Sequence, residues 1–554
     1  GDEIEDEISL LKIEARSRYD VTAEKLKGLP KEIPKMNSLA ELRMYVADSF
    51  DPAAFSSTDK QRARRALRRG RGVDADADPL GLRSADLPGL DVVFPGLRPT
   101  AASNLRSPGR LLHIVTTASL PWMTGTGVNP LLRAAHLAKA GYNTTLYLPW
   151  LVDVKDQDYI FPEGLRFERP KQQEQYVRWW LENRANVAVG KELRIRWYDA
   201  EYKPFIGGII QRGDIIATIP KEERDVVILE EPEHLNWYHH GPRWTEAFEH
   251  VVGVAHTNYI SYCVMNDKGW AGGELKGKFT EIMNNLVIAA HTDVVVRLSA
   301  TLPAVPGYDL VCNVHGVRAE FLAVGASMSD PTKVRFSQGA YFLGKALWTK
   351  GYRELWDSMR LYPSDDLPEL HTYGSGPEQD EIKAEAEGLP VQVNGGIDHA
   401  HPSLHGYRVF VNPSTSDVLC TATAEALAMG KKVVIPDHPS NTFFRQFSNC
   451  IMFDPEKPGE LVPAIAEALA SDPNPMSPME QYMLSWEAAT ERLLDAAALP
   501  EGAPRTNERP SHALAYYTHY GMGIQPVFDA FRSATGAEPV IEWNDQLTSG
   551  QKGH

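Results

Sequence analysis

Cysteine is scarce in this 554-residue chain. Its four cysteines form no CxxC pair and stand at Cys263, Cys312, Cys420 and Cys450. They are too few for a disulfide scaffold and wrongly spaced for structural zinc, so we expect free thiols. Long apolar runs are also missing. No uninterrupted apolar stretch reaches the roughly 18 residues typical of a transmembrane helix, so none is expected.

Positive charge is in short supply as well. Lys and Arg total 57 against 73 Asp and Glu, which gives a formal net charge of -16. A surface of that sign repels phosphate backbones, so we expect no nucleic-acid partner. The chain also has no GxxxxGK[ST] phosphate loop and no GxGxxG followed by an acid about 20 residues later. The second absence argues against an NAD-dependent dehydrogenase.

Residues 1–108 differ in composition from the rest of the chain, and we interpret them as an N-terminal extension with a linker. Residues 17–54 predict short helices. DADAD at 74–78 mimics a metal-binding run of acids, but it lies in the linker without a flanking strand, so we predict no metal site there. A cluster of arginines without an acid lies between these segments and comprises Arg62, Arg64, Arg65, Arg68, Arg69 and Arg71.

Beyond this extension, short apolar runs alternate with amphipathic stretches. The first series predicts a helix over 131–141, with Pro130 near its start, and strands over 111–117, 143–150, 225–232, 250–257 and 292–299. The second series predicts helices over 350–362 and 421–430, and strands over 341–346, 369–376, 407–414 and 431–437. A further amphipathic helix is predicted over 483–497. This alternation predicts an α/β fold of two Rossmann-like domains facing a cleft.

Candidate site residues of the first series follow predicted strand ends, where ligands collect in open α/β sheets. In the loop over 121–129, Gly125 and Gly127 permit close backbone approach to a ligand, or serve only a tight turn. Trp122 is a core ring or a sugar-stacking platform. His256 lies at the carboxyl end of the strand over 250–257, and a lone histidine there is a ligand group or a hydrogen-bonded structural residue. The polar segment 230–241 forms an active-site wall or a domain-facing loop.

Candidate site residues of the second series suit an anionic ligand. Lys345 and Lys350 flank a strand end and a helix start, where two ammonium groups can converge on one diphosphate or simply face solvent. Asp417 precedes the helix over 421–430, and Glu425 lies on its first turns. Glu425 can accept both hydroxyls of a ribose, while Asp417 and nearby amides face a sugar and diphosphate. The alternative is a helix-capping acid and a surface glutamate.

Taken together, these motifs resemble a known enzyme family. GK-x4-KG, YGSGPE and NPSTSDVLCTATAEALAMGKKVV resemble the retaining GT-B glycosyltransferases of family four. Longer strings, such as TTASLPWMTGTGVNPLLRAAHLAKA, ILEEPEHLNWYHHGPRW and GVAHTNY, resemble the digalactosyldiacylglycerol synthases of plants and algae. The resemblance covers residues 111–494. It implies a GT-B arrangement, with an acceptor domain over 109–300 and a UDP-sugar donor domain over 301–475. Residues 476–500 then cross back to the first domain, and 501–554 form a C-terminal extension.

The resemblance also implies an activity and roles for residues. The activity is transfer of galactose from UDP-galactose to monogalactosyldiacylglycerol, giving an α-linked digalactosyl lipid. His256 matches the active-site histidine, Glu425 the ribose-binding acid, and Lys350 the lysine of the diphosphate pair. Lys345 stands where the family has Arg, and Asp417 where it has Glu. The loop of Trp122, Gly125, Thr126 and Gly127 matches the one that meets diphosphate and acceptor, with Gly127 also on the donor side.

Mechanism and location are further expectations. Without an obvious carboxylate nucleophile, retention suggests same-face attack, and no metal or other cofactor is expected if lysines and helix amides stabilise UDP. A lipid substrate implies a peripheral enzyme of the chloroplast outer envelope, with an anionic membrane surface as partner of the arginine cluster. Two alternatives stay open: another GT-B UDP-sugar enzyme with a different acceptor, and a catalytically inactive membrane scaffold.

Overall fold

The computed structural model describes residues 99–508, except 205–206, 238, 240, 260–269, 306 and 329–335. The chain divides into two compact units, residues 1–100 with 500–503 and residues 101–499 with 504–554. Both sheets belong to the second unit. Several predicted features lie outside the described residues: the helices over 17–54, the arginine cluster, DADAD and Cys263.

The first sheet has eight strands in the order β4-β3-β2-β1-β5-β6-β7-β8. They are β1 (Leu111–Val115), β2 (Asn143–Leu151), β3 (Leu193–Lys203), β4 (Gly208–Gln211), β5 (Val226–Glu230), β6 (His250–Ala255), β7 (Val294–Arg297) and β8 (Tyr308–Val311). All pairs are parallel except that of β3 with the edge strand β4. Strands such as β5 are buried throughout, which explains their continuous apolar sequence.

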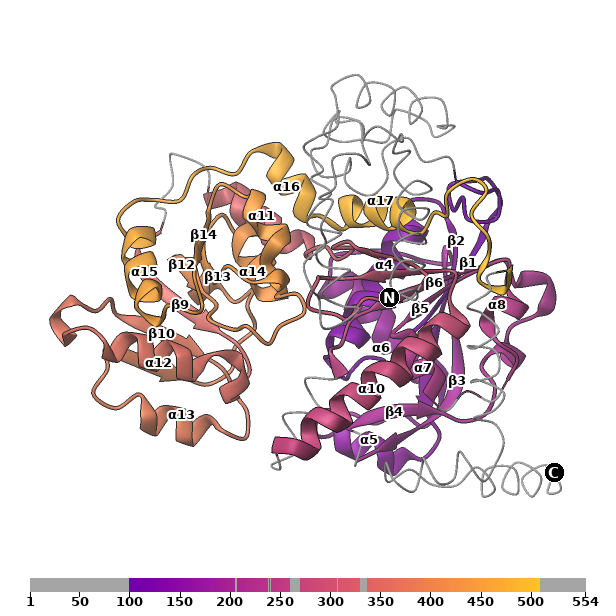
Figure 1. The fold of residues 1–554 in the computed structure, drawn as a ribbon, viewed down its shortest axis with the longest axis horizontal. Coiled ribbons are helices and arrows are strands. Elements are labelled where there is room, and N and C mark those ends of the chain that lie inside the picture. The colour runs from indigo at the N-terminus through magenta and orange to yellow at the C-terminus, as the bar shows by residue number, and fades with distance from the viewer. Residues whose placement is uncertain are drawn as a thin grey trace, which may run out of the picture. The chain divides into compact units, whose positions relative to one another are not determined.

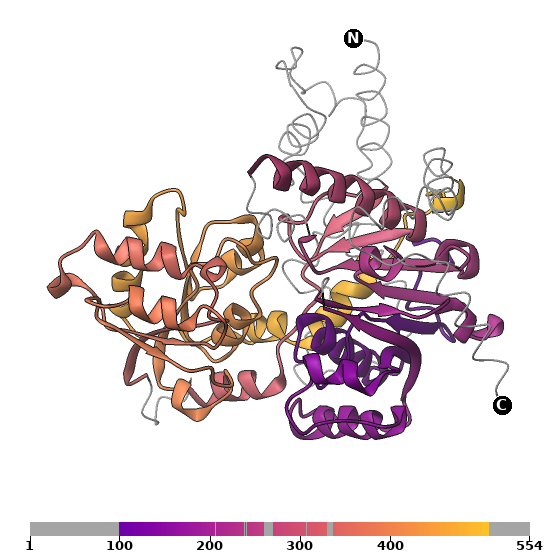
Figure 2. The same ribbon diagram turned by 90° about the horizontal axis from the view of Figure 1, so that it is seen from below.

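Helices cover both faces of this sheet. They are α4 (Gly125–Lys139), α5 (Val154–Ile160), α6 (Pro170–Asn183), α7 (Pro232–Trp237), α8 (Trp244–Ala247) and α10 (Trp270–His291). Figure 2 shows α4 and α6 on one side of the strands and α10 on the other. Because chain order reverses between β1 and β5, the crossover helices change face there, as in other doubly wound sheets.

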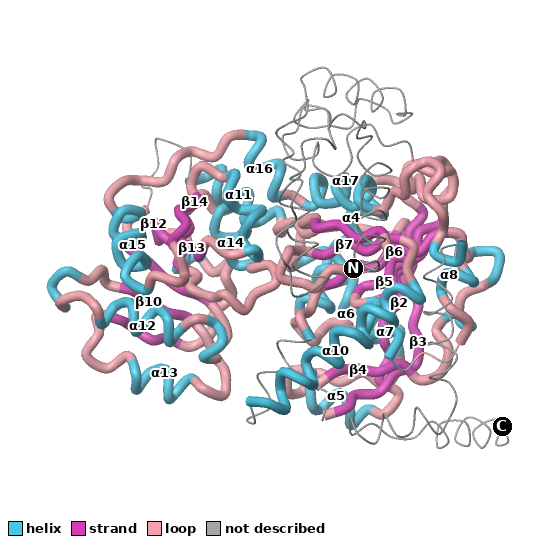
Figure 3. Tube along the Cα trace, in the orientation of Figure 1, coloured by secondary structure: helices cyan, strands magenta, loops and turns pink. Residues whose placement is uncertain are grey.

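The second sheet has six parallel strands in the order β11-β10-β9-β12-β13-β14. The strands are β9 (Gln338–Leu343), β10 (Leu370–Tyr373), β11 (Val391–Asn394), β12 (Tyr407–Val411), β13 (Lys432–Pro436) and β14 (Cys450–Phe453). Its helices are α11 (Ala319–Met328), α12 (Tyr352–Arg360), α13 (Gln379–Glu385), α14 (Thr421–Ala428) and α15 (Leu461–Leu469). Figures 1 and 3 show the two sheets as separate groups of strands flanked by helices.

The structure confirms the α/β class with two Rossmann-like sheets. Every strand predicted from an apolar run is present, with ends that differ by a few residues. The sequence patterns missed five strands, β3, β4, β8, β11 and β14. They also missed the helices α5, α6, α7, α8, α10, α11, α13 and α15. Since β8 pairs with β7, the first sheet continues past residue 300, to Val311.

The start of α4 differs from the prediction. The helix begins at Gly125, so Pro130 lies inside it and the two glycines stand in its first turn rather than in a loop. Proline has no N–H to donate to the carbonyl four residues earlier, that of Thr126. The Thr116 hydroxyl donates to this carbonyl instead, at 2.5 Å. The strand end therefore satisfies the acceptor that Pro130 leaves open.

The predicted helix over 483–497 is two helices, α16 (Pro478–Leu484) and α17 (Trp486–Ala496). Ser485 between them has an extended backbone, and its hydroxyl caps α17 by accepting the N–H of Ala488. The Leu484 carbonyl accepts the N–H of Val317 at 2.8 Å. Helix α17 packs against α4, and the Trp486 ring stacks on His136.

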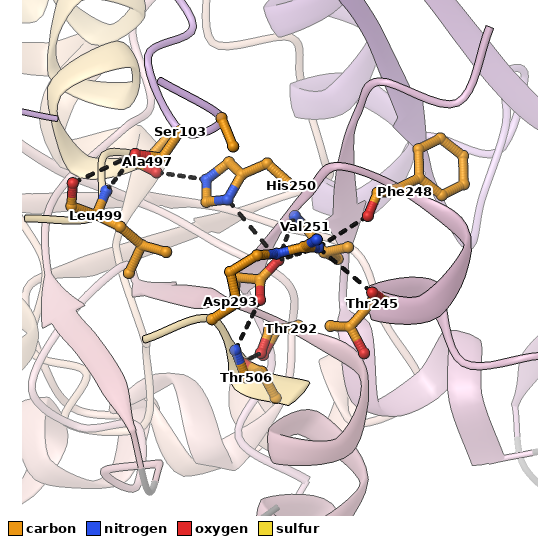
Figure 4. A network of polar contacts seen from close by, with 12 residues as sticks. Ser103, Thr245, Phe248, His250, Val251, Thr292, Asp293, Ala497, Leu499 and Thr506 are labelled. Carbon is orange, nitrogen blue, oxygen red and sulfur yellow. Dashed lines mark hydrogen bonds and ion pairs between the residues drawn. The ribbon is translucent and has the colours of Figure 1, made fainter. Parts of the chain in front are cut away.

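The segment after α17 is bound to the amino edge of the first sheet (Figure 4). Buried Asp293 accepts the backbone N–H groups of Val251 at 3.0 Å and Thr506 at 3.1 Å, and it pairs with Arg505 at 3.5 Å. His250 donates to the carbonyl of Ala497 at 2.7 Å. These contacts lie at the strand edge opposite the predicted site.

The sequence predicts free cysteine thiols and no transmembrane helix. Cys312, Cys420 and Cys450 are free thiols, as expected. Within the described ranges, no helix is both long and apolar enough to cross a membrane.

Candidate functional site

The first part of the candidate site is a buried charge cluster at the carboxyl end of β5. Glu230 ends this strand and is fully buried. Arg133 of α4 donates Nε–H to Glu230 Oε1 at 2.6 Å, and His256, just after β6, donates Nε2–H to Glu230 Oε2 in a short contact. Burial alone raises the pKa of Glu230, but Arg133 and His256 outweigh it and lower the pKa below its ordinary value. Glu230 therefore remains a carboxylate.

This cluster fixes the tautomer of His256. Because Nε2–H donates to a carboxylate, Nδ1 is the ring nitrogen left to meet a further hydrogen-bonding group. The ring of fully buried His315 lies 5.0 Å from that of His256, measured between centroids. Burial, then the charges of His256 and Arg133, hold the pKa of His315 well below its usual range. Sequence patterns predicted His256 and, as the start of the polar segment 230–241, Glu230, but they missed Arg133 and His315.

The first turn of α4 forms a second feature of this edge. Thr124 caps the helix through its hydroxyl, which accepts the N–H of Gly127 at 3.2 Å. A β-carbon on Gly127 would lie 2.8 Å from the carbonyl oxygen of Trp122, so only glycine fits there. Exposed Gly125 and half-buried Thr126 lie at the positive end of the helix dipole, which suits an anion. Trp122 is half-buried and packs edge-on against Tyr202.

Two further glutamates follow Glu230. Glu231 has a φ of 63°, a left-handed conformation that a residue with a side chain seldom adopts. Its carboxylate accepts the hydroxyl of Thr117 at 2.8 Å and that of Thr257 in a short contact. Burial, and then the charge of Glu231, raise the pKa of Glu233 to about 8. The residues that follow β5 thus include acids of different protonation state, an ionised Glu230 and a protonated Glu233.

The donor-side residues gather at the carboxyl edge of the second sheet. Lys350 Nζ pairs with Asp417 Oδ1 at 2.5 Å, and Asn412 donates to Asp417 Oδ2 at 3.4 Å. Lys345 is exposed in the loop after β9, without an ion pair to any residue that the structure describes. The structure therefore brings Lys350 and Asp417 together.

Gly351 makes the position of Lys350 possible. The three residues over 348–350 form a short 3₁₀ turn, and Gly351 follows it with a φ of 89° before α12 begins. A β-carbon on Gly351 would lie 2.7 Å from the carbonyl carbon of Pro413 and 2.9 Å from the amide nitrogen of Ser414. The backbone after β12 thus touches the lysine turn directly, and it leads on to Asp417.

Glu425 lies one turn into α14 and is held by residues from other elements. Its Oε2 accepts Nδ1–H of His399 at 2.8 Å, and His399 Nε2 accepts the hydroxyl of Tyr341 at 2.7 Å. Burial, then the charge of Glu425, keep the pKa of Tyr341 well above its usual range, so it remains a donor. Neither Tyr341 nor His399 carries a motif that sequence reasoning could use, since both act through tertiary contacts.

Metal ligands are not grouped in the described parts of the chain. No set of three or more His, Cys, Asp or Glu side chains is placed to hold a metal ion there.

Comparison with known proteins gives concordant results. A family model described as "Glycosyl transferases group 1" matches residues 338–471, which carry the second sheet. Digalactosyldiacylglycerol synthase 1, chloroplastic, of Lotus japonicus is 46% identical over 406 residues, which is 72% of this chain and 50% of that protein. Digalactosyldiacylglycerol synthase 2, chloroplastic, of the same plant is 41% identical over 430 residues, covering 76% of this chain and 90% of that protein.

The chain thus spans about half the length of the first relative and most of the second. Among solved structures, sucrose-phosphate synthase from Thermosynechococcus elongatus aligns with 15% identity and a TM-score of 0.40. That alignment covers 76% of this chain and 100% of the other.

The raised pKa of Glu233 predicts how stability depends on pH. The folded state keeps a proton up to about pH 8, while the unfolded chain releases it near the ordinary value of 4.5. The free energy of unfolding should therefore fall between pH 5 and 8, by at most about 1.4 kcal/mol per pH unit from this group. Glu233→Gln should remove this slope, so its free energy of unfolding should rise relative to that of the wild type as pH rises.

Urea unfolding at pH 5, 6, 7 and 8 measures the effect. Glu249→Gln, which changes an exposed acid at the amino end of β6, serves as control and should run parallel to the wild type. Parallel curves for Glu233→Gln as well would show that Glu233 is ionised in the folded protein.

Proposed function

The chain belongs to the digalactosyldiacylglycerol synthase family, and from this we propose that it transfers galactose from UDP-galactose to monogalactosyldiacylglycerol, giving digalactosyldiacylglycerol with an α linkage. Membership rests on 41% identity to a family member of which the alignment covers 90%. The observation that carries the proposal is the donor edge of the second sheet. There, a lysine–aspartate pair and a held glutamate lie within the segment matched by the group 1 glycosyl transferase model.

Binding of UDP-galactose follows from the charges at this edge. Glu425 has one oxygen held by His399, which directs the carboxylate and leaves acceptor capacity for the two ribose hydroxyls. Lys350 binds the diphosphate, either giving up its contact with Asp417 or keeping it. Lys345 adds a second positive charge. Asp417 then accepts a hydroxyl of the galactose. Arg would bind the diphosphate in a bidentate way, whereas Lys345 acts as a point charge.

Transfer with retention requires that the new bond form on the face from which UDP leaves. The bond between galactose C1 and the diphosphate oxygen breaks, and the acceptor oxygen bonds to C1 on the same face. The proton of the acceptor hydroxyl passes to the leaving phosphate oxygen, so no protein carboxylate needs to attack. His256 orients the galactose through Nδ1, and the first-turn amides of Gly125 and Thr126 in α4 stabilise the growing negative charge. Gly127 contributes by leaving room for the close approach of the Trp122 carbonyl, since its own N–H is bonded to Thr124.

This chemistry needs no metal ion if Lys345, Lys350 and the helix amides supply the positive field. We therefore propose that transfer persists in EDTA, and a strict requirement for Mn²⁺ or Mg²⁺ would contradict it. The proposed location is the chloroplast outer envelope, and the relatives' names, which say chloroplastic, support the chloroplast part of this proposal. The proposed mode of attachment is peripheral, with an anionic lipid surface bound by the arginine cluster over 62–71.

The activity itself is tested by label transfer. The full chain should move label from UDP-[¹⁴C]galactose into digalactosyldiacylglycerol when monogalactosyldiacylglycerol is supplied in mixed micelles. Lys350→Met should lower kcat by about 100-fold or more, because a charge that meets the leaving diphosphate is lost. Lys383→Met, at an exposed position of α13, is the matched control and should keep full activity.

Three results would contradict the proposal. Label in water-soluble galactose alone, or in another acceptor, would indicate a different enzyme. Unchanged lipid product in Lys350→Met would remove the role of the donor edge. No turnover of UDP-galactose by the wild type would favour a scaffold.

His399 supplies a sharper test of the donor pose. In His399→Ala, Glu425 loses the hydrogen bond that orients it, so its contact to the ribose should weaken. The wild type should prefer UDP-galactose over its 2′-deoxyribose analogue by about 10-fold in kcat/KM, and the variant should lose most of that preference. His401→Ala, which changes an exposed histidine two residues later, is the control.

A purely structural role of His399 would lower kcat/KM for both donors equally and leave the preference intact. That result would show that Glu425 does not contact the 2′-hydroxyl through this arrangement.

A further inference from the structure

Lys431, directly before β13, is a fully buried lysine to which the proposed function gives no role. Its Nζ donates to the backbone carbonyls of Leu404 and Tyr407, each at 2.8 Å, and to that of His405 at 2.9 Å. The three N–H groups of the ammonium thus meet three acceptors, and no carboxylate of the described residues forms an ion pair with it. Burying a lysine is costly, and an apolar side chain would fill such a site at less cost. Packing alone therefore does not explain Lys431.

The three carbonyls lie where the connection from β11, residues 395–406, enters β12. This connection also carries His399, whose Nδ1–H donates to Glu425 at 2.8 Å. Within the connection, Nε2–H of His405 donates to the carbonyl of Ala400 at 2.9 Å. Lys431 thus holds the second half of the connection, and His405 ties that half to the residue after His399. The backbone position of His399 therefore depends on the buried lysine.

A second route leads from Lys431 to His399 through Tyr341. The hydroxyl of Tyr341 donates to His399 Nε2 at 2.7 Å. Lys431 Nζ lies 5.7 Å from the centroid of the Tyr341 ring and 5.5 Å from that of Phe336, within the reach of a cation–π interaction. The same ammonium group therefore also stabilises the ring whose hydroxyl holds His399.

We propose that Lys431 is a positioning residue for donor binding. It fixes His399 through the β11–β12 connection and through Tyr341, so that Glu425 presents its carboxylate to the ribose hydroxyls of the nucleotide. That Glu425 meets the ribose rests on the proposed function, whereas the link from Lys431 to His399 rests on the contacts within the second sheet and its connections.

Titration calorimetry with UDP and 2′-deoxy-UDP measures the ribose contact without any transfer. The full wild-type chain should bind UDP about 10-fold more tightly than the 2′-deoxy analogue. In Lys431→Met this preference should fall to about 2-fold, because Glu425 is no longer directed at the 2′-hydroxyl. The variant should bind 2′-deoxy-UDP as tightly as the wild type does, since only the ribose contact is lost.

The next residue supplies a matched control. Lys432 is also buried, and its Nζ donates to the carbonyl of Ala468 at 3.1 Å and to the hydroxyl of Ser471 at 2.6 Å. Lys432→Met therefore loses a comparable set of hydrogen bonds, none of them to the β11–β12 connection, and should keep the full preference. A purely structural role of Lys431 would weaken the binding of both nucleotides equally and leave the preference intact, which would overturn the proposal.

The wild type offers a measurement that needs no variant, should Lys431→Met not fold. Burial lowers the pKa of Lys431 to about 7, so the group loses one of its three N–H donors as pH rises from 6.5 to 8.5. The preference for UDP should fall by about half over this range. Burial lowers the pKa of His405, which stays neutral, and raises the pKa of Tyr341 and Tyr407, which keep their protons.

His399 is the other titratable group of this network, and Lys431→Gln separates its effect from that of Lys431. This variant cannot lose a proton at position 431, so its preference should be lower than that of the wild type and constant from pH 6.5 to 8.5. A constant preference in the wild type, or a slope that persists in Lys431→Gln, would contradict the proposal.

The outcomes separate this proposal from the proposed function. Loss of the preference in Lys431→Met, in a chain that transfers no galactose to lipid, supports the role of Lys431 and refutes the proposed function. Normal lipid transfer with a full preference in Lys431→Met supports the function and refutes the role of Lys431. No binding of UDP by the wild type would refute both.

Discussion

The buried carboxylate of Glu230 is the contact on which the acceptor side depends. It joins α4 through Arg133 and the end of β6 through His256, and Arg133 also donates to the Val314 carbonyl at 2.8 Å. Burying a carboxylate and a guanidinium is costly unless each is paired and hydrogen-bonded, and removing one partner typically costs about 3–5 kcal/mol. This one side chain thereby holds both α4, through Arg133, and the histidine.

On the donor side, too, a carboxylate is held by side chains from other elements. Tyr341 and His399 reach Glu425 through a chain of two hydrogen bonds that fixes the histidine tautomer. Beneath Tyr341 lies buried Lys431, whose ammonium group donates to the carbonyls of Leu404 and Tyr407, each at 2.8 Å. Burial lowers the pKa of Lys431 to about 7. Both sheets thus place supporting groups behind the side chain that we propose meets the substrate.

Much of the fold was predictable because parallel strands buried on both faces appear as plain apolar runs, as in β1, β5 and β12. The start of α4 was not predictable, because a proline usually marks the first turn of a helix. Pro130 lies further inside α4, where the Thr116 hydroxyl binds the carbonyl that the proline leaves without a partner. Edge strand β4 is short, β3 mixes charged with apolar residues, and α10 carries three glycines. None of the three therefore shows the regular spacing of apolar residues that is typical of a strand or a helix.

The candidate site divides in a similar way. His256, Lys350, Asp417 and Glu425 stand at strand ends and helix starts, where spacing and resemblance predict them. Their partners Glu230 and His399 are each 26 residues away in the chain, so only the fold brings them together. The central claim is that both edges serve one retaining galactosyl transfer, and NMR of the lipid made from UDP-[¹³C]galactose tests it most directly. The claim predicts a new terminal galactose with the small anomeric coupling of an α linkage, and the large coupling of a β linkage would contradict it.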